Sequence, residues 1–261
     1  MKRRLISRES IVLPESFDSL LSGADIYDSS CSQEARVIFV DKGCGYYLKS
    51  APVGSLKKEA LMSDYFHKKG LSSALIEYIS ADKDYLLTER VLGEDCTYRN
   101  FLDNPKRLAT VIGESLRMLH ELDFSDCPIK NRMGAYFDLA EENYSKGAYD
   151  LSYFKTDARG ITADDVWRIA SSVRSSLKSD TLLHGDYCLP NIMLDNWKLS
   201  GFIDLGGAGV GDKHVDLFWG AWTLNYNLNT DKYRDVFFDA YGKTDIDFDI
   251  LEAIGAIECF G

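Results

Sequence analysis

The chain has 261 residues, of which 45% are hydrophobic and 27% charged. These values are typical of a globular protein of one or two domains, and no apolar stretch approaches the roughly 18 residues of a membrane helix. The basic start MKRRLISR has no apolar core behind it and is not expected to be a signal peptide. The six cysteines are scattered without a CxxC pair, so we expect reduced thiols and a cytoplasmic location.

The formal net charge of −11 is carried by one part of the chain. Up to Leu92, 13 Lys and Arg residues balance 13 Asp and Glu residues, whereas from Gly93 onward there are 17 against 28. A surface of this kind repels nucleic acid and anionic membranes and concentrates cations, so we expect neither a nucleic-acid nor a membrane partner. The acidic residues either serve solubility alone or attract a cationic substrate.

Residues 1–92 are predicted to form a small β-rich lobe that carries one helix. Short apolar runs bounded by turns predict strands, and a stripe of apolar residues ended by Gly70 predicts an amphipathic helix. The expected strands are 34–40, 46–50, 75–79 and 85–89, and the expected helix is 56–69.

Lys49 lies in the second of these strands, among apolar neighbours. A strand lysine that contacts nucleotide phosphates needs a counter-ion when no nucleotide is bound, and Glu59 on the following helix can supply it. Two simpler interpretations stay open. Lys49 can be a solvated edge-strand residue, and Glu59 can be a surface charge beside Lys57 and Lys58.

The turn at residues 29–33 precedes the first expected strand, where a nucleotide-covering loop would lie. It contains no glycine and is therefore not a GxGxxG loop. Ser32 in this turn can bind a phosphate or cap the turn. Residues 89–93 join the first lobe to the rest of the chain, and backbone groups of Glu89 and Val91 can bind the adenine edge there.

Residues 93–261 are predicted to form a larger, mainly helical lobe. Apolar residues recur in it at helical spacing, without an internal repeat or a flexible linker. The expected helices are 105–121, 133–149, 162–179, 213–226, 230–241 and 247–260.

The strongest functional signal lies at residues 182–205, where two short apolar runs separated by a polar turn predict a hairpin. Asp186 can accept the proton of an acceptor hydroxyl, and Asn191 with Asp204 supplies the oxygen ligands that Mg²⁺ prefers. These are the side chains that phosphoryl transfer from ATP requires, in the order D-x4-N followed by D-L-G. For any one of these residues, a solvated turn position is the simpler interpretation. The complete set in this order favours catalysis.

The sequence resembles the aminoglycoside phosphotransferases, most closely those that act on a 3′-hydroxyl. The resemblance runs through HGDYCLPNIMLDNWKLSGFIDLGGAGVGDKHVDL and extends to Lys49 with Glu59, to LRMLHELDFSDCP and to the C-terminal IECF. It implies an α+β, protein-kinase-like bilobal fold, with a nucleotide-binding lobe at 1–92 and a catalytic and substrate-binding lobe at 93–261. It also implies phosphorylation of an aminoglycoside hydroxyl, the 3′-hydroxyl by closest resemblance, and hence antibiotic resistance.

The resemblance further implies the roles of single residues. Asp186 would be the catalytic carboxylate, and Lys49, held by Glu59, would bind the α- and β-phosphates. Asn191 and Asp204 would bind Mg²⁺, Tyr47 would stack near the adenine, and Ser32 would lie in the loop that covers the phosphates. His184 would be part of the scaffold. Glu258 and Phe260 would bind the substrate, and Asp150 and Asp157 are candidates for an acidic substrate loop. We expect ATP as donor with GTP as an alternative, Mg²⁺, a small cationic aminoglycoside as the partner, and a monomer or weak dimer.

Two positions depart from the family pattern. Gly207 stands where similar enzymes commonly carry an arginine after the metal-loop glycine, which affects how that loop is braced. The chain continues to Gly261, whereas many relatives stop at the preceding aromatic residue, so a contact from the terminal carboxylate would shift by one residue.

Two other functions compete with this one. A kinase of another small cation, such as choline, would use an aromatic cage, for which Trp219, Trp222 and Tyr226 are candidates, although the same residues suit helix packing. A nucleotide-binding pseudokinase is favoured by Gly207 alone, and the otherwise intact set of polar residues argues against it.

Overall fold

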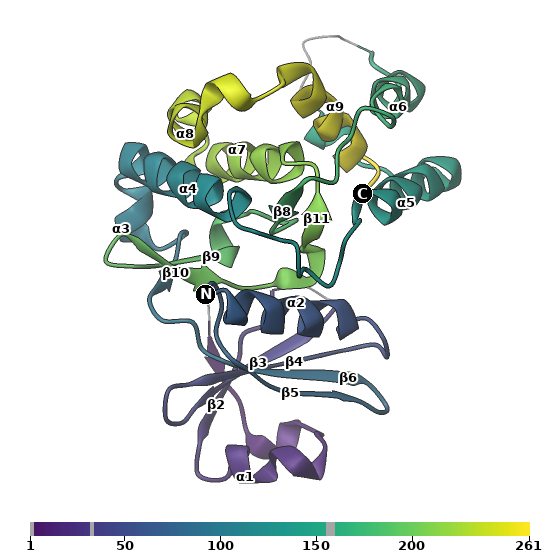
Figure 1. Ribbon diagram of the computed structural model, residues 1–261. Helices are drawn as coiled ribbons and strands as arrows, with labels where there is room; N and C mark the ends of the chain where they lie inside the picture. Colours follow the sequence, from purple (N-terminus) through teal and green to yellow (C-terminus); the bar gives the residue numbers. More distant parts are fainter. Residues whose placement is uncertain (1–2, 32–33, 155–159) are drawn as a thin grey trace. The chain divides into compact units, whose positions relative to one another are not determined.

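The computed structural model describes residues 3–31, 34–154 and 160–261 (Figure 1). The chain forms two compact units. The first comprises Met1–Asp95 and Ile192–Gly206, and the second comprises Cys96–Asn191 and Gly207–Gly261. The division expected at residue 92 falls close to the first of these breaks, whereas the segment 192–206 belongs to the first unit although it lies within the expected second lobe.

Antiparallel strands dominate the first unit. Six of them form one sheet in the order β1-β2-β3-β4-β6-β5, and a smaller sheet has the order β10-β9-β7. The elements of this unit are β1 (Arg4–Leu5), α1 (Asp18–Leu21), β2 (Asp25–Asp28), β3 (Arg36–Asp41), β4 (Tyr46–Ala51), α2 (Lys57–Lys68), β5 (Leu75–Ser80), β6 (Asp84–Glu89), β7 (Glu94–Asp95), β9 (Ile192–Asp195) and β10 (Lys198–Phe202).

The strand β4 lies inside the large sheet, between β3 and β6. Because side chains alternate between the two faces of a strand, Lys49 and Ala51 share one face and Leu48 faces the other. Ala51 packs in an apolar cluster with Ala60 of α2. Leu48 belongs to the cluster on the opposite face, which includes Leu21 of α1. The ammonium of Lys49 is therefore directed to the face that α2 covers.

The hairpin expected near residue 195 is present as β9 and β10. Its two turn residues, Asn196 and Trp197, have φ angles of 49° and 65°. Two consecutive positive φ angles are typical of the tight turns that fit the twist of a hairpin. Gly93, with a φ angle of 88°, precedes β7, and a Cβ atom there would lie 2.2 Å from the carbonyl oxygen of Leu194. Only glycine fits where β7 meets β9.

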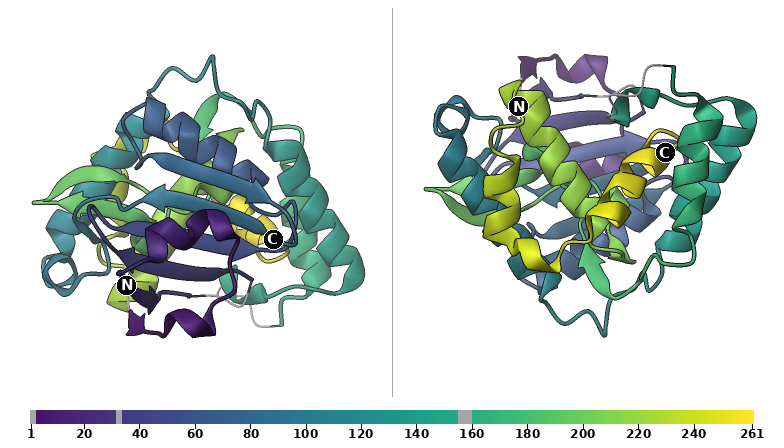
Figure 2. Two further views of the ribbon diagram at one scale, coloured as in Figure 1. Left: turned by 90° about the horizontal axis from the view of Figure 1, so that it is seen from below. Right: turned by 90° about the horizontal axis from the view of Figure 1, so that it is seen from above.

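The second unit is mainly helical. Its elements are α3 (Arg99–Leu102), α4 (Pro105–His120), α5 (Met133–Lys146), α6 (Ala163–Ser172), β8 (Thr181–Leu183), β11 (Gly209–Gly211), α7 (His214–Leu228), α8 (Arg234–Tyr241) and α9 (Phe248–Glu258). The helix α7 packs against α4, α8 and α9, while α9 also packs against α5 and α6 (Figure 2). β8 and β11 pair with each other, so the chain segment before Asp186 and the segment after Gly207 are held together.

All the expected helices are present, and the largest difference concerns the end of one of them. The helix expected over 162–179 begins with a capping box of Thr162 and Asp165 but ends at Ser172. The hydroxyls of Ser171 and Ser172 donate hydrogen bonds to carbonyl groups three residues back, which competes with continuation of the helix. Within the described ranges, no helix is long and apolar enough to cross a membrane.

Candidate active site

Three charged side chains meet in the first unit. The Nζ atom of Lys49 donates to Oε2 of Glu59 at 2.8 Å and to Oδ1 of Asp204 at 2.9 Å. Glu59 lies in the first turn of α2, where the helix dipole favours a carboxylate, and Asp204 follows β10. The predicted pairing of Lys49 with Glu59 is therefore present, and Asp204 joins it.

The surroundings of this cluster keep the lysine charged. Burial lowers the pKa of Lys49, but the carboxylates of Glu59 and Asp204 outweigh it and the net pKa is raised. Burial raises the pKa of Glu59, an effect that the ammonium of Lys49 opposes and the charge of Asp204 reinforces. Glu59 is buried, whereas the side chain of Asp204 is 51% exposed. An exposed carboxylate beside a fixed ammonium can take part in binding a charged ligand.

Asp204 has an unusual backbone conformation, with a φ angle of 59°. This left-handed region is costly for most residues and more accessible to Asp and Asn. Such conformations persist where the surrounding structure fixes them, and they concentrate at functional sites. Here the conformation orients the carboxylate of Asp204 toward Lys49 at the end of β10.

In the second unit, the loop after β8 is fixed by a buried carboxylate. Asp216 of α7 has no exposed surface and accepts hydrogen bonds from the backbone N–H groups of His184 at 2.8 Å and Gly185 at 2.7 Å. Its Oδ2 atom also lies 3.1 Å from Nε2 of His120. These partners more than offset burial, so the pKa of Asp216 is lowered. The residue before Asp186 is thus held by an ionised, fully paired group.

Gly185 and Gly207 pack backbone against backbone. Gly185 has a φ angle of 84°, and a Cβ atom there would lie 2.0 Å from the carbonyl oxygen of Gly207. A Cβ atom on Gly207 would lie 3.0 Å from the carbonyl group of Gly185. A longer side chain at 207 would therefore press on the loop that carries Asp186. The backbone of this chain therefore packs closely around Gly207.

Asp186 and Asn191 contact each other directly. The Nδ2 atom of Asn191 donates to Oδ2 of Asp186 at 2.8 Å and to the Asp186 carbonyl at 3.1 Å. Between them lies Cys188, whose thiol has its pKa raised by burial and by the Asp186 carboxylate. The thiol therefore stays protonated and is not a nucleophile beside Asp186.

The donor set suits Mg²⁺. Because Asn191 uses its amide nitrogen toward Asp186, its carbonyl oxygen is the atom left for a metal ion. Asp204 binds Lys49 through Oδ1, and its Oδ2 is a second hard oxygen. The described parts of the chain hold no group of three or more His, Cys, Asp or Glu that could bind a metal by themselves. Mg²⁺ that is bound with phosphates needs only one or two carboxylates, so Asp204 in the first unit and Asn191 in the second each present an oxygen of the kind that this ion prefers.

The predicted adenine-side residues occupy one part of the first unit. The ring of Tyr47 lies 5.1 Å from that of Phe39, and its hydroxyl accepts from Arg3 at 2.7 Å. Val91 is buried, and Glu89 ends β6 with its N–H donated to a carbonyl group of the neighbouring loop. Ser32 lies outside the described residues.

The predicted substrate residues at the C-terminus are buried. Oε1 of Glu258 accepts from the Tyr136 hydroxyl at 2.7 Å and from Nε1 of Trp219 at 3.0 Å. Phe260 is 1% exposed and packs edge-to-face against the ring of Trp167 at 5.4 Å. Its backbone carbonyl accepts from Asn143 at 2.8 Å. The contact of Glu258 and Phe260 with a substrate stays a prediction.

The two acidic candidates of the substrate loop differ in what the structure shows. The side chain of Asp150 accepts from the N–H of Ser152 at 2.9 Å and caps the short turn that begins at Leu151. Asp157 lies outside the described residues.

No role could be predicted from the sequence for Asp216 or for Arg132. The guanidinium of Arg132 lies 5.0 Å from the ring centre of Tyr136, and its Nη1 atom is buried without a hydrogen-bond partner among the described residues. Its charge also lowers the pKa of Glu258, although burial prevails there. The only sign of Asp216 in the sequence was its place in the HVDL segment, which belongs to the stretch that resembles the family.

A pH dependence of stability follows from Glu258. Burial raises the pKa of this carboxyl from 4.5 to about 7. Between these values the folded protein keeps a proton that the unfolded chain has released, so the stabilisation is complete below pH 4.5 and is lost as pH rises through 7. We expect the free energy of unfolding of the wild type to fall by about 3 kcal/mol over this pH range because of Glu258. The Glu258→Gln variant should not show this decrease.

Urea unfolding of the wild type and the Glu258→Gln variant from pH 5 to pH 8 measures this effect. The free energy of unfolding of the variant, relative to the wild type, should increase with pH. A constant difference would show that Glu258 titrates at its ordinary pKa in the folded protein.

Comparison with known proteins gives a consistent result. The model of the phosphotransferase enzyme family matches residues 32–254. A probable aminoglycoside 3′-phosphotransferase of Lactococcus lactis is 49% identical over 249 residues, which is 95% of each chain. An aminoglycoside 3′-phosphotransferase of Niallia circulans is 31% identical over 166 residues, which is 64% of this chain and 63% of the relative.

Solved structures share the fold. A crystal structure of an aminoglycoside 3′-phosphotransferase of type VIII has a TM-score of 0.77 at 21% identity, over 94% of this chain and 97% of the other. An aminoglycoside phosphotransferase of Streptomyces rimosus in complex with ADP and streptomycin has a TM-score of 0.71 at 22% identity, over 86% of this chain and 90% of the other. The expected α+β, kinase-like fold is confirmed.

Proposed function

Because the chain belongs to the phosphotransferase enzyme family, we propose that it transfers the γ-phosphoryl group of ATP to the 3′-hydroxyl of aminoglycoside antibiotics and thereby confers resistance. The observation that carries this proposal is the complete set of polar groups for phosphoryl transfer, Lys49–Glu59–Asp204 in one unit and Asp186–Asn191 in the other. The Lactococcus lactis relative, identical at 49% of positions over nearly its whole length, supports the substrate class.

On this proposal the first unit binds the nucleotide. Lys49 contacts the α- and β-phosphates and is oriented by Glu59, while Tyr47 and the backbone of Glu89 and Val91 hold the adenine. ATP is the donor and GTP an alternative. Bound Mg²⁺ would neutralise phosphate charge during transfer, and Asp204 with Asn191 would hold it.

The acceptor side depends on Asp186. Its carboxylate orients the acceptor hydroxyl and takes up the proton late, because the transition state is loose and needs little activation of the nucleophile. Asp216 fixes the backbone ahead of Asp186 and acts as a positioning residue. Most of the rate enhancement then comes from orientation and electrostatics.

The setting of the reaction follows from the same proposal. The described residues include all six cysteines and show no disulfide among them, which suits a reducing cytoplasm where ATP is available. The acidic second part of the chain suits a polyamine substrate, and no nucleic acid is needed. We propose that the chain acts as a monomer or weak dimer.

Two competing functions are weakened by particular observations. The rings of Trp222 and Tyr226 stack in parallel at 4.9 Å, which leaves no room for a quaternary ammonium between them. Gly207, the one argument for a pseudokinase, stands against the otherwise intact set of Lys49, Asp186, Asn191 and Asp204.

ADP release with Mg²⁺ and ATP tests the proposal. We expect turnover with kanamycin and none with tobramycin, which lacks the 3′-hydroxyl. Turnover with both compounds would move the reaction to another hydroxyl. If a folded protein that binds ATP showed no turnover with either compound, the aminoglycoside function would be left without support.

A further inference from the structure

The glycine ahead of Asp186 is held by two oppositely charged side chains of the second unit. The N–H of Gly185 donates to Oδ1 of Asp216 at 2.7 Å, and its carbonyl oxygen accepts from Nη2 of Arg132 at 3.4 Å. Asp216 lies in α7, whereas Arg132 directly precedes α5. Gly185 has a φ angle of 84° and no side chain that could fix the loop by packing. The two charged groups therefore fix the loop through its backbone.

The backbone of Arg132 is tied to the strands that lead into this loop. Its N–H donates to the carbonyl of Val210 at 2.9 Å, and the N–H of Val210 donates to the carbonyl of Ile129 at 2.8 Å. Val210 lies in β11, which pairs with β8, and β8 ends directly before His184. The segment 129–132, β11 and β8 are thus joined by backbone hydrogen bonds, and Arg132 reaches Gly185 from a fixed base.

The side chain of Arg132 is also restricted along its length. Its stem packs against β11, because a Cβ atom on Gly211 would lie 3.4 Å from its Cγ atom. Its guanidinium lies 5.0 Å from the ring centre of Tyr136, and the Nη1 atom is buried without a hydrogen-bond partner among the described residues. A buried charged donor without a partner costs free energy, which nearby negative charge can offset.

The nearby negative charge comes from two carboxyl groups. Burial raises the pKa of Glu258 to about 7, and the charge of Asp186 adds to this rise while that of Arg132 opposes it. The three groups are therefore close enough to interact. The loop from Asp186 to Asn191 contains no Lys or Arg of its own. Arg132 thus brings a positive charge to this loop and reduces the repulsion between Asp186 and Glu258.

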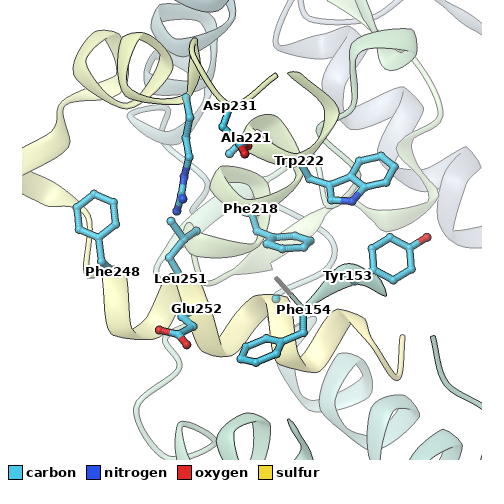
Figure 3. A pocket seen from close by; sticks show the side chains of 11 residues that line it. Tyr153, Phe154, Phe218, Ala221, Trp222, Asp231, Phe248, Leu251 and Glu252 are labelled. Carbon is cyan, nitrogen blue, oxygen red and sulfur yellow. The ribbon is translucent and has the colours of Figure 1, made fainter. Parts of the chain in front are cut away.

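The guanidinium does not serve the cavity of about 360 Å³ in the same unit. Trp222 of α7 and Leu251 of α9 are among the residues that line this cavity, and neither Arg132 nor Asp186 lines it (Figure 3). The contacts of Arg132 therefore indicate a role in the loop of Asp186.

We propose that Arg132 is a positioning residue for phosphoryl transfer, which holds the Gly185 peptide group together with Asp216 and thereby fixes the direction of the Asp186 carboxylate. This inference rests on the proposed function. Without the guanidinium, Asp186 is still present, but its carboxylate is less well aligned with the acceptor hydroxyl. A misalignment of about 1 Å is sufficient to slow a reaction by about 10²-fold.

Two substitutions of Arg132 test this role. We expect Arg132→Met to lower kcat with kanamycin by about 30-fold and to leave the KM for ATP within about twofold, because Lys49 and Asp204 belong to the other unit. Arg132→Lys keeps the charge but not the planar fork, so its kcat should fall only about fivefold. If the Met variant does not fold, the Lys variant decides.

Hydrogen exchange followed by mass spectrometry measures the position of the loop without any turnover. The N–H groups of His184 and Gly185 are donated to Asp216. In Arg132→Met, the peptide 182–189 should exchange about tenfold faster than in the wild type. Peptides from α8 should exchange at the wild-type rate, since the effect is local.

Arg174→Met is the matched control. Arg174 lies in the same unit, binds Asp138 and Glu141, and has its guanidinium 4.6 Å from the ring centre of Phe137. This substitution removes an arginine with similar kinds of contact, and it should leave both kcat and the exchange of the peptide 182–189 unchanged.

The possible results separate this role from the proposed function. Unchanged exchange of the peptide 182–189 in Arg132→Met, or an equal rise in every peptide, would overturn the positioning role while the proposed function stands. A kcat that is unchanged in both Arg132 variants would do the same. Absence of wild-type turnover with kanamycin would instead overturn the proposed function, and with it any catalytic role of Arg132.

Discussion

Replacement of Asp186 by Asn is expected to lower kcat by about 10³-fold and to leave the affinity for ATP within about twofold. The variant keeps the shape of the side chain, and its amide oxygen can still accept from Asn191. It loses the negative charge that orients the acceptor hydroxyl and the site that takes up the proton. ATP affinity should persist because Lys49, Glu59 and Asp204 belong to the other unit of the chain.

The matched control is Asp180→Asn. Asp180 is exposed, lies just before β8 and accepts from the hydroxyl of its neighbour Thr181. Steady-state turnover with kanamycin and calorimetric titration with ATP would be measured for both variants. If Asp186→Asn retained more than about a tenth of wild-type kcat, Asp186 would not be the catalytic carboxylate.

Asp204→Asn is expected to lower kcat/KM for MgATP by about 10²- to 10³-fold. The substitution removes one of the two negative charges that face the ammonium of Lys49, together with the carboxylate proposed to bind Mg²⁺. The side chain of Asp204 is 51% exposed and Lys49 keeps its pairing with Glu59, so loss of this ion pair should cost at most about 1 kcal/mol of stability. Reduced activity would therefore not result from unfolding.

A titration with Mg²⁺ at fixed ATP separates this role from a general defect. The Asp204 variant should need a much higher Mg²⁺ concentration for half-maximal rate. Asp195→Asn on the same hairpin changes a carboxylate that accepts from Asn196 and should leave the Mg²⁺ dependence unchanged. An unaltered Mg²⁺ requirement in Asp204→Asn would exclude this residue as a metal ligand.

The sequence was most informative where neighbours along the chain decide the structure. The β9–β10 hairpin was predictable from apolar runs around a polar turn, and its two turn residues have the backbone angles such a turn requires. The pairing of Lys49 with Glu59 was suggested by the sequence because a strand lysine near phosphates needs a counter-ion and the following helix carries a carboxylate, and the structure contains this pair.

Other features of the fold and the site depend on contacts between residues that are distant along the chain, and these contacts leave little signal in the sequence. β2 reads DIYD, with charges at both ends, and it exists because it pairs with β3. Asp216 is one of many acidic residues in the second part of the chain, and only the folded structure shows that it is fully buried against the loop of Asp186. The ion pair of Asp204 with Lys49 joins residues far apart in sequence.

The burial of the C-terminal segment was equally hidden in the sequence. Glu258 was expected at the substrate because of its position in the family pattern. In the structure its carboxyl accepts hydrogen bonds from Tyr136 and Trp219, and its raised pKa makes it sensitive to pH near 7, while its role at the substrate stays a prediction.

The position of the phosphate in the product tests the central claim most directly. Kanamycin would be incubated with the protein, ATP and Mg²⁺, and the purified product examined by two-dimensional ¹H–³¹P correlation NMR. We predict a single phosphate ester whose phosphorus couples to the proton on C3′. Coupling to a proton on any other carbon, or recovery of unmodified kanamycin from a folded and ATP-binding protein, would contradict the assignment as a 3′-phosphotransferase.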